Sequence, residues 1–138
     1  MRLRDVEDVS KLTPAMQQYA SLKKNNESSL LFFRMGDFYE LFFDDAIITA
    51  KELNITLTKR GKVLNESIPM CGIPFHAANN YVPKLVKKGF EIAICEQTSS
   101  PEEMSLKGIK GPLTREVTRI ITPGTLIEEN HLENEQYN

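Results

Sequence analysis

An aromatic ring and a carboxylate two residues apart are the pair in this chain best suited to contact a ligand. Phe38 and Glu40 lie in the run Arg34-Met-Gly-Asp-Phe-Tyr-Glu-Leu-Phe-Phe-Asp-Asp45. In an extended segment, side chains at i and i+2 share a face, so both would reach one target. The ring would stack and the acid would hydrogen-bond. A Gly-Asp pair directly before Phe38 favours a turn that presents them, because Gly permits positive φ and Asp caps turns.

A buried strand is the simpler interpretation of the same run. Five of the seven Phe residues fall between positions 32 and 43. Apolar, aromatic-rich runs usually belong to the core, with Glu40 then lying at its rim. Composition alone leaves the exposed turn and the buried strand as alternatives.

Carboxylates in this region also permit a metal-dependent nuclease. Five acidic residues could hold Mg²⁺ for phosphodiester hydrolysis: Asp37, Glu40, Asp44, Asp45 and Glu96. A nuclease of the Asp…Glu-x-Lys kind would carry a Lys two residues after its strand acid, but Gln97-Thr98 follows Glu96. We therefore expect no catalytic residues. A third alternative is a module whose exposed aromatic residues bind a protein partner.

Length and composition indicate a single soluble domain. The chain has 138 residues, of which 41% are hydrophobic and 26% charged. No apolar run approaches a membrane span and the N-terminus lacks a signal peptide, so a cytoplasmic protein without membrane contact is expected. Cys71 and Cys95 lack metal-ligand spacing and are predicted to be reduced core thiols. With His76 and His131 they are too few and too scattered to predict a metal site.

The net charge of −2 hides an uneven distribution. Residues 126–138 carry four Glu and no Lys or Arg, whereas residues 11–125 carry fifteen basic and twelve acidic groups, a net of +3. Basic residues cluster at positions 59–62, 84–88 and 107–119. Such patches permit phosphate contact, although solvated faces are the simpler explanation, above all for 84–88.

Alternating helix and strand patterns predict an α/β fold, with a mixed β-sheet flanked by α-helices in a single domain. Helices are predicted at residues 13–25, 44–54 and 77–88, and strands at 29–35, from 56 to Gly61, at 91–96 and at 114–122. Prolines make 68–74 an edge or irregular segment, and 98–113 is predicted to be a loop. Residues 1–11 are expected to form a flexible arm, 12–127 the domain, and 128–138 an acidic polar tail.

Several runs in this order resemble the N-terminal mismatch-recognition domain of the MutS family of bacterial DNA mismatch repair proteins. The matching runs begin with Thr13-Pro-x-Met-x-Gln and continue through Phe33–Ala46, Leu57–Gly61, Ile68–Ala77, Val86–Gly89, Ala93–Gln97 and Thr118–Thr125. Together they cover about residues 12–127. Several independent motifs in order are far more specific than one short pattern.

The resemblance implies that Phe38-Tyr39-Glu40 enters the minor groove of mismatched or looped double-stranded DNA. Phe38 would stack on a mispaired or unpaired base, and Glu40 would hydrogen-bond the base edge. A wedge costs a few kcal/mol per unstacked step, least where pairing is already defective. A carboxylate among phosphates is repelled, so we expect the proton affinity of Glu40 to rise on binding.

The resemblance suggests further contacts. Lys59, Arg60 and His76 lie in matched segments and are candidates for positioning the backbone or groove, although His76 is equally well explained as a structural histidine. Met35 and Met70 are expected to pack against Phe38 and fix its rotamer.

For the family's full-length protein, the resemblance implies ATP and Mg²⁺ binding, a homodimer and downstream repair partners. This chain has no Gly-x-x-x-x-Gly-Lys-Ser/Thr run, so we expect neither a cofactor nor ATPase activity here. We expect a monomeric N-terminal piece of a longer protein, which contacts other domains of the same chain and lacks the connector region.

Overall fold

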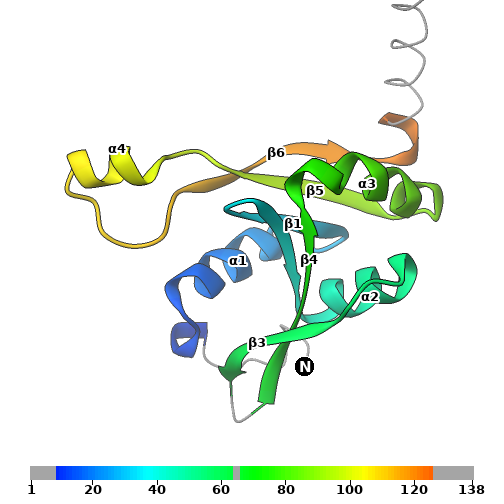
Figure 1. Ribbon diagram of the computed structural model, residues 1–138, viewed down its shortest axis with the longest axis horizontal. Helices are drawn as coiled ribbons and strands as arrows, with labels where there is room; N and C mark the ends of the chain where they lie inside the picture. Colours follow the sequence, from blue (N-terminus) through cyan, green and yellow to red (C-terminus); the bar gives the residue numbers. More distant parts are fainter. Residues whose placement is uncertain (1–8, 64–65, 126–138) are drawn as a thin grey trace, which may run out of the picture.

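The computed structural model describes residues 9–63 and 66–125, and in them six strands form one mixed sheet (Figure 1). The strands are β1 (Ser29–Met35), β2 (Phe38–Phe42), β3 (Thr58–Val63), β4 (Glu66–Pro74), β5 (Glu91–Gln97) and β6 (Arg115–Ile121). Their order is β3-β4-β2-β1-β5-β6, with β1 parallel to β5 and every other pair antiparallel. The predicted α/β fold with a mixed sheet is confirmed.

α1 (Pro14–Lys24) covers one face of this sheet, and α2 (Phe43–Leu53) and α3 (Ala78–Lys87) cover the other. The remaining helical elements are the short α4 (Pro101–Leu106) and the 3₁₀ turns η2 (Val9–Lys11) and η3 (Phe75–Ala77). Thr13 caps α1 by accepting the Met16 N–H, and Pro14 occupies the first turn, as the sequence predicts.

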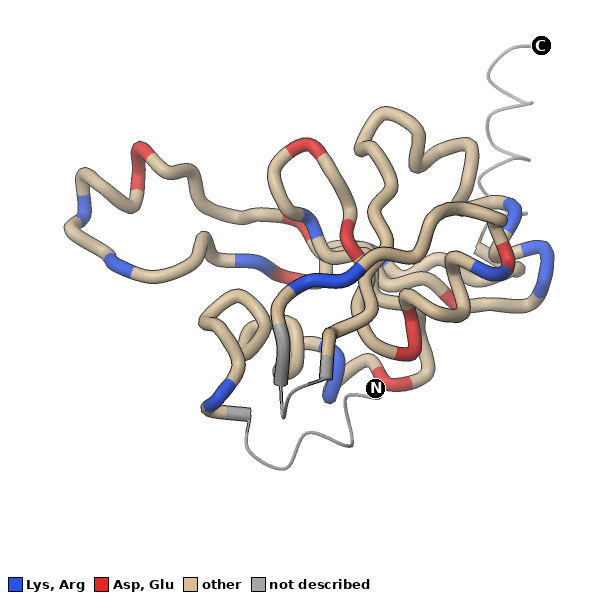
Figure 2. The backbone as a smooth tube through the Cα atoms, turned by 60° about the horizontal axis from the view of Figure 1, so that its bottom comes forward, with Lys and Arg blue, Asp and Glu red and all other residues tan. Residues whose placement is uncertain are grey.

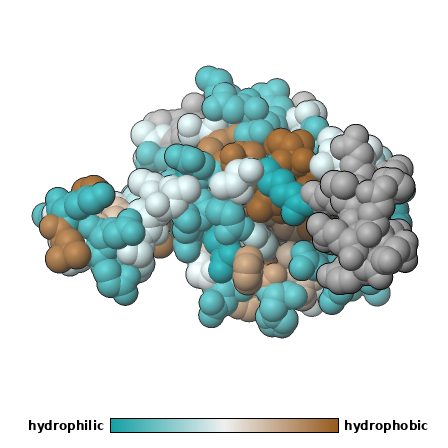
Figure 3. Space-filling model, turned by 90° about the horizontal axis from the view of Figure 1, so that it is seen from above, coloured by the Kyte–Doolittle hydropathy of each residue, from teal (hydrophilic) through white to brown (hydrophobic). Residues whose placement is uncertain are grey.

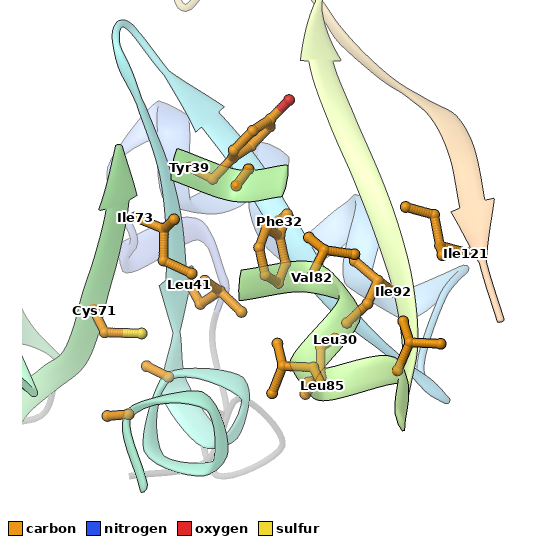
Figure 4. Close-up of a cluster of buried hydrophobic side chains, with 14 residues drawn as sticks. Leu30, Phe32, Tyr39, Leu41, Cys71, Ile73, Val82, Leu85, Ile92 and Ile121 are labelled. Carbon is orange, nitrogen blue, oxygen red and sulfur yellow. The ribbon is translucent and has the colours of Figure 1, made fainter. Parts of the chain in front are cut away.

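Alternating side chains of the central strands form two cores. Leu30, Phe32, Tyr39 and Leu41 point to the face covered by α2 and α3, where Val82 and Leu85 join them (Figure 4). On the other face, Leu31, Phe33 and Phe42 pack with Met16 and Tyr19 of α1. The period of two in β1 and β2 therefore decides which core each aromatic residue enters.

A buried polar network joins α1 to the start of α2. The Tyr19 hydroxyl donates to the Phe42 carbonyl at 3.1 Å, and its ring meets the Phe42 ring edge-on with centroids 5.0 Å apart. Asp45 accepts from Lys23 Nζ at 3.0 Å and from the Leu31 N–H at 3.0 Å. Buried charges need such partners, so this network fixes one end of β2 against α1.

β2 runs into α2 without a connecting loop. Phe42 is both the last strand residue and the N-cap of α2, and Phe43 takes the left-handed value φ = 56°. This conformation is unusual for a bulky residue and must be held by its surroundings. Phe43 is 2% exposed within the α1 core, and packing there supplies the restraint.

β4 lies inside the sheet, so the prediction of an edge or irregular segment at 68–74 is wrong. β4 pairs with β3 through residues 66–70 and with β2 through residues 70–74, and only Met70 has partners on both sides. Each proline of β4 therefore lies in a half that has one paired neighbour. A missing N–H is tolerated there because it can face the unpaired side.

The predicted loop at 98–113 contains a helix. Ser100 Oγ accepts the Glu103 N–H at 3.1 Å and Pro101 begins α4, so the Ser-Pro-Glu-Glu run is a helix start and the prediction of a loop throughout 98–113 is wrong there. This segment forms an arm that extends well beyond the sheet (Figure 1). Its end appears as a separate lobe with apolar atoms on its surface (Figure 3), and Leu106 is 88% exposed there.

Most of the predicted flexible arm, residues 1–8, and the acidic tail, residues 128–138, lie outside the described residues. Across residues 9–63 and 66–125, every helix is too short or too polar to cross a bilayer.

Candidate nucleic-acid interface

The β1–β2 hairpin presents the Phe38 end of β2 at one end of the sheet. Gly36 has φ = 62°, and Met35 pairs with Phe38 directly across the turn. The Phe75 N–H donates to the Asp37 carbonyl at 2.7 Å and ties the turn to the start of η3. The predicted turn before Phe38 is thus confirmed, and a backbone bond from a distant segment supports it.

Phe38 is exposed, in contrast to most of the aromatic residues around it. Its side chain is 45% exposed, whereas Phe32, Phe33 and Phe42 are fully buried. The ring lies near the backbone of Gly72, where a Cβ atom would stand 3.6 Å from Phe38 Cδ1. Both interpretations of the aromatic run are therefore correct in part: the run forms the core, and its one exposed ring lies at the hairpin.

Glu40 shares the face of Phe38 and forms an ion pair. Its Oε1 lies 2.9 Å from Arg60 Nη1, with 15% of the Glu40 side chain and 40% of the Arg60 side chain exposed. Burial raises the pKa of the Glu40 carboxyl above its usual value, while Arg60 and, less strongly, Arg115 oppose that shift. The carboxyl is thus held as an ion pair at a site that favours its neutral form.

Arg115 of β6 contacts residues on the face of the sheet that carries Phe38 and Glu40. Its guanidinium lies 4.5 Å from the Phe33 ring centroid, and its Nε donates to the Arg34 carbonyl at 2.7 Å. Nη1 also donates to Gln18 Oε1, and Nη2 lies 3.4 Å from Met35 Sδ. Burial lowers the pKa of Arg115. The sequence places Arg115 in a basic cluster and on a predicted strand, but no local pattern shows that its side chain joins β6, β1 and α1.

The remaining predicted contact residues lie in different places. Met35 is half-buried and pairs with Phe38 across the turn, and its packing against the Phe38 ring stays a prediction. Met70 instead pairs with Phe42, four residues from the partner of Phe38, so the expected packing of Met70 on Phe38 is wrong. Lys59 pairs with Pro69 and faces away from the Phe38 side, because neighbouring strand residues point to opposite faces.

His76 is exposed in η3, close to the hairpin. It follows Pro74 by two residues, and Pro74 pairs with Phe38 across β2 and β4. The position of His76 is compatible with positioning a ligand near Phe38.

A second aromatic and ionic cluster supports the hairpin from behind. The Arg34 guanidinium lies 3.7 Å from the Phe75 ring centroid and 3.1 Å from Glu96 Oε2. The Tyr39 hydroxyl donates to Glu96, and burial, with Glu96 second, raises the pKa of Tyr39 to about 12. Arg34 and Tyr39 face each other on the side opposite Phe38, so this cluster was not visible from the i, i+2 pattern.

The acidic residues of the nuclease alternative do not converge. Within residues 9–63 and 66–125, no three His, Cys, Asp or Glu side chains lie close enough to hold a metal ion. Asp45 is paired with Lys23, Glu96 with Arg34, and Glu40 with Arg60. Figure 2 likewise shows acidic and basic positions distributed along the described part of the chain.

Comparison with known proteins identifies one family that covers most of this chain. The family model described as MutS domain I matches residues 13–130. The DNA mismatch repair protein MutS of Bartonella quintana (strain Toulouse) is 55% identical over 123 residues, which are 89% of this chain. The chain spans 14% of the length of that relative. With most of its length matched by one family model, the chain belongs to the MutS domain I family.

Proposed function

We propose that this chain is the lesion-recognition domain of a DNA mismatch repair protein. The family match and the name of the Bartonella relative support a role in mismatch repair. The observation that carries the proposal is one exposed aromatic ring, Phe38, at the hairpin with Glu40 on the same face.

Phe38 acts as the wedge in this proposal. Its ring enters the minor groove and stacks on a mispaired or unpaired base, which returns about 1–3 kcal/mol and tolerates any base. Opening a stack costs least where pairing is already defective, so the ring senses deformability without reading sequence. The bracing of the turn by Asp37 and Phe75 supports this role, because a wedge must resist displacement.

Glu40 acts as the discriminator. A carboxylate that enters the groove is repelled by phosphates, and that repulsion weakens binding to matched duplex. A protonated Glu40 can donate a hydrogen bond to a base nitrogen at the lesion. The half-buried position of Glu40 supports this role, since burial already raises its pKa.

The full-length protein completes the function. We propose that Arg60 and His76 help to position the DNA, and that other domains supply most phosphate contacts, ATP and Mg²⁺ binding, dimerisation and contacts with downstream repair proteins. The chain spans 14% of its relative, and few phosphate contacts imply weak, salt-sensitive binding by this domain alone.

A binding comparison tests the proposal. Dissociation constants of the full-length protein would be measured at fixed salt for a G·T mismatch, a one-base loop and a matched duplex. Phe38→Ala is expected to lose the lesion preference by about tenfold or more while matched-duplex binding stays the same, because only stacking is removed.

Ile47→Ala is the matched control. Ile47 is exposed to a similar extent, 40% against 45% for Phe38, but lies on α2, the helix that covers the opposite face of the sheet. The control should keep the lesion preference. A folded Phe38→Ala variant that kept it too would exclude Phe38 as the wedge.

A further inference from the structure

Glu40 is already engaged in this structure. Its Oε1 accepts from Arg60 at 2.9 Å, and only 15% of its side chain is exposed. A base that approached Glu40 would therefore meet an existing ion pair. Whatever Glu40 does at a lesion must begin with the loss or rearrangement of that pair.

Glu40 and Arg60 differ in how much each would be destabilised if their ion pair opened. Glu40 is half-buried, and a carboxylate stripped of its cation there is left uncompensated unless it gains a proton or a new hydrogen bond. Arg60 is 40% exposed, and its guanidinium lies 5.9 Å from the Phe42 ring centroid on the same face. A released guanidinium would be stabilised by any phosphate nearby, because its planar fork suits phosphate oxygens.

We propose that Arg60 is a specificity-determining residue that competes with DNA for Glu40. The inference rests on the proposed role of Glu40 at lesions. At a lesion the pair opens, Glu40 turns to the displaced base and Arg60 turns to the phosphate backbone. On matched duplex no base is available to Glu40, so the pair stays closed, Arg60 gains no phosphate contact, and the Glu40 carboxylate keeps its unfavourable interaction with the phosphates.

Because of this exchange, Arg60 affects the ratio of lesion binding to matched-duplex binding as well as the affinity for DNA. An arginine that only contacts a phosphate strengthens binding to matched and lesion DNA by the same factor. An arginine that must be displaced from Glu40 changes the ratio of the two. The charged groups that face Glu40 are Arg60 from β3 and, at longer range, Arg115 from β6.

A double-mutant cycle separates these cases. Dissociation constants for one-base-loop and matched duplexes would be measured at fixed salt with full-length wild-type, Arg60→Gln, Glu40→Gln and doubly substituted protein. Arg60→Gln is expected to raise the lesion-to-matched preference about threefold or more, because Glu40 no longer has to leave a partner to reach the base, and to have no further effect on preference once Glu40 is Gln.

The pH profile gives a second readout that a merely structural residue would not change. Without Arg60, burial acts on Glu40 with less opposition, so the pKa of Glu40 rises further. The pH dependence of the lesion preference should move to higher pH in Arg60→Gln and vanish in Glu40→Gln. Arg60→Lys, which keeps the charge, should give a smaller shift and serves in place of Arg60→Gln if that variant unfolds.

Lys51→Gln is the control for loss of one positive charge. Lys51 is exposed on α2, the helix that covers the opposite face, and its substitution should leave the preference unchanged. The inference is overturned if Arg60→Gln lowers the lesion preference or leaves it unchanged, or if its effect on preference persists undiminished with Gln at position 40. Failure of the proposed function has a different signature, namely a lesion preference that survives Phe38→Ala.

Discussion

The space beneath the Phe38 ring yields a graded prediction at Gly72. A Cβ at this position would lie 3.6 Å from Phe38 Cδ1, which is ordinary van der Waals contact. Gly72 has no positive φ that would strain a larger residue. Gly72→Ala should therefore leave the ring in place and stabilise the strand by up to about 1 kcal/mol, since Gly is the more flexible residue in the unfolded chain.

Gly72→Val should behave differently, because its methyl groups extend about 1.5 Å beyond Cβ. Val has two methyls on Cβ, and one directed at the ring would lie far inside the ~3.5 Å contact distance of carbon atoms. The Phe38 ring must then rotate or lift away from β4. Val favours strands, so this variant should fold while its wedge is displaced.

The assay is the lesion-to-matched ratio of dissociation constants, with a urea denaturation curve for each variant. We expect Gly72→Ala to stay within about twofold of wild type and Gly72→Val to lose about tenfold in preference, since displaced stacking is worth about 1–3 kcal/mol. A folded Gly72→Val protein with wild-type lesion preference would refute the idea that the orientation of the Phe38 ring depends on the space above Gly72.

Three other predictions concern stability, protonation and thiol reactivity. Phe42→Ala should lower the free energy of unfolding by about 3–5 kcal/mol in urea denaturation, because the ring is fully buried. Phe38→Ala should lower it by about 1 kcal/mol or less, because that ring lies at the surface. Equal losses of stability would contradict the assignment of one ring to the core and the other to the surface. Because burial raises the pKa of the Glu40 carboxyl, its protonated fraction grows as pH falls, so the lesion preference should increase as pH is lowered from neutral in wild type and stay flat in Glu40→Gln. The same raised pKa means that the contribution of Glu40 to the free energy of unfolding is greatest at low pH and is lost as pH rises through the pKa of the folded state. Burial raises the pKa of Cys71 and Cys95 to about 12, so mass spectrometry should find both thiols unlabelled by iodoacetamide in the folded protein and labelled in urea, and rapid labelling of the folded form would refute the burial.

Local sequence patterns predicted the helix start and the turn, which depend on interactions between neighbouring residues. Thr13-Pro14 specified the start of α1, and the Gly36-Asp37 pair specified the turn that exposes Phe38. Both depend on backbone preferences of one or two residues. The α4 helix was equally local, with a Ser100 cap, and could have been found from the sequence.

Long-range pairing accounts for most of the rest. Prolines made β4 look like an edge, and nothing local shows that its two halves pair with different strands. Glu40 and Arg60 are twenty residues apart, and Arg115 reaches Met35 from eighty residues away. The register of strand pairing decides which side chains meet across a sheet. That register depends on the packing of the complete domain and not on the sequence of any one segment.

The direct passage from β2 into α2 has a mechanical consequence. In the proposed role of Phe38 as a wedge, the base stack that it opens would push back on Phe38 at one end of a five-residue strand. At the other end there is no compliant loop, only Phe43 locked at φ = 56° by its packing and a helix anchored through Asp45. The strand is therefore supported by a helix at its far end, and in the proposed role the force of insertion would pass into the body of the domain instead of bending the hairpin.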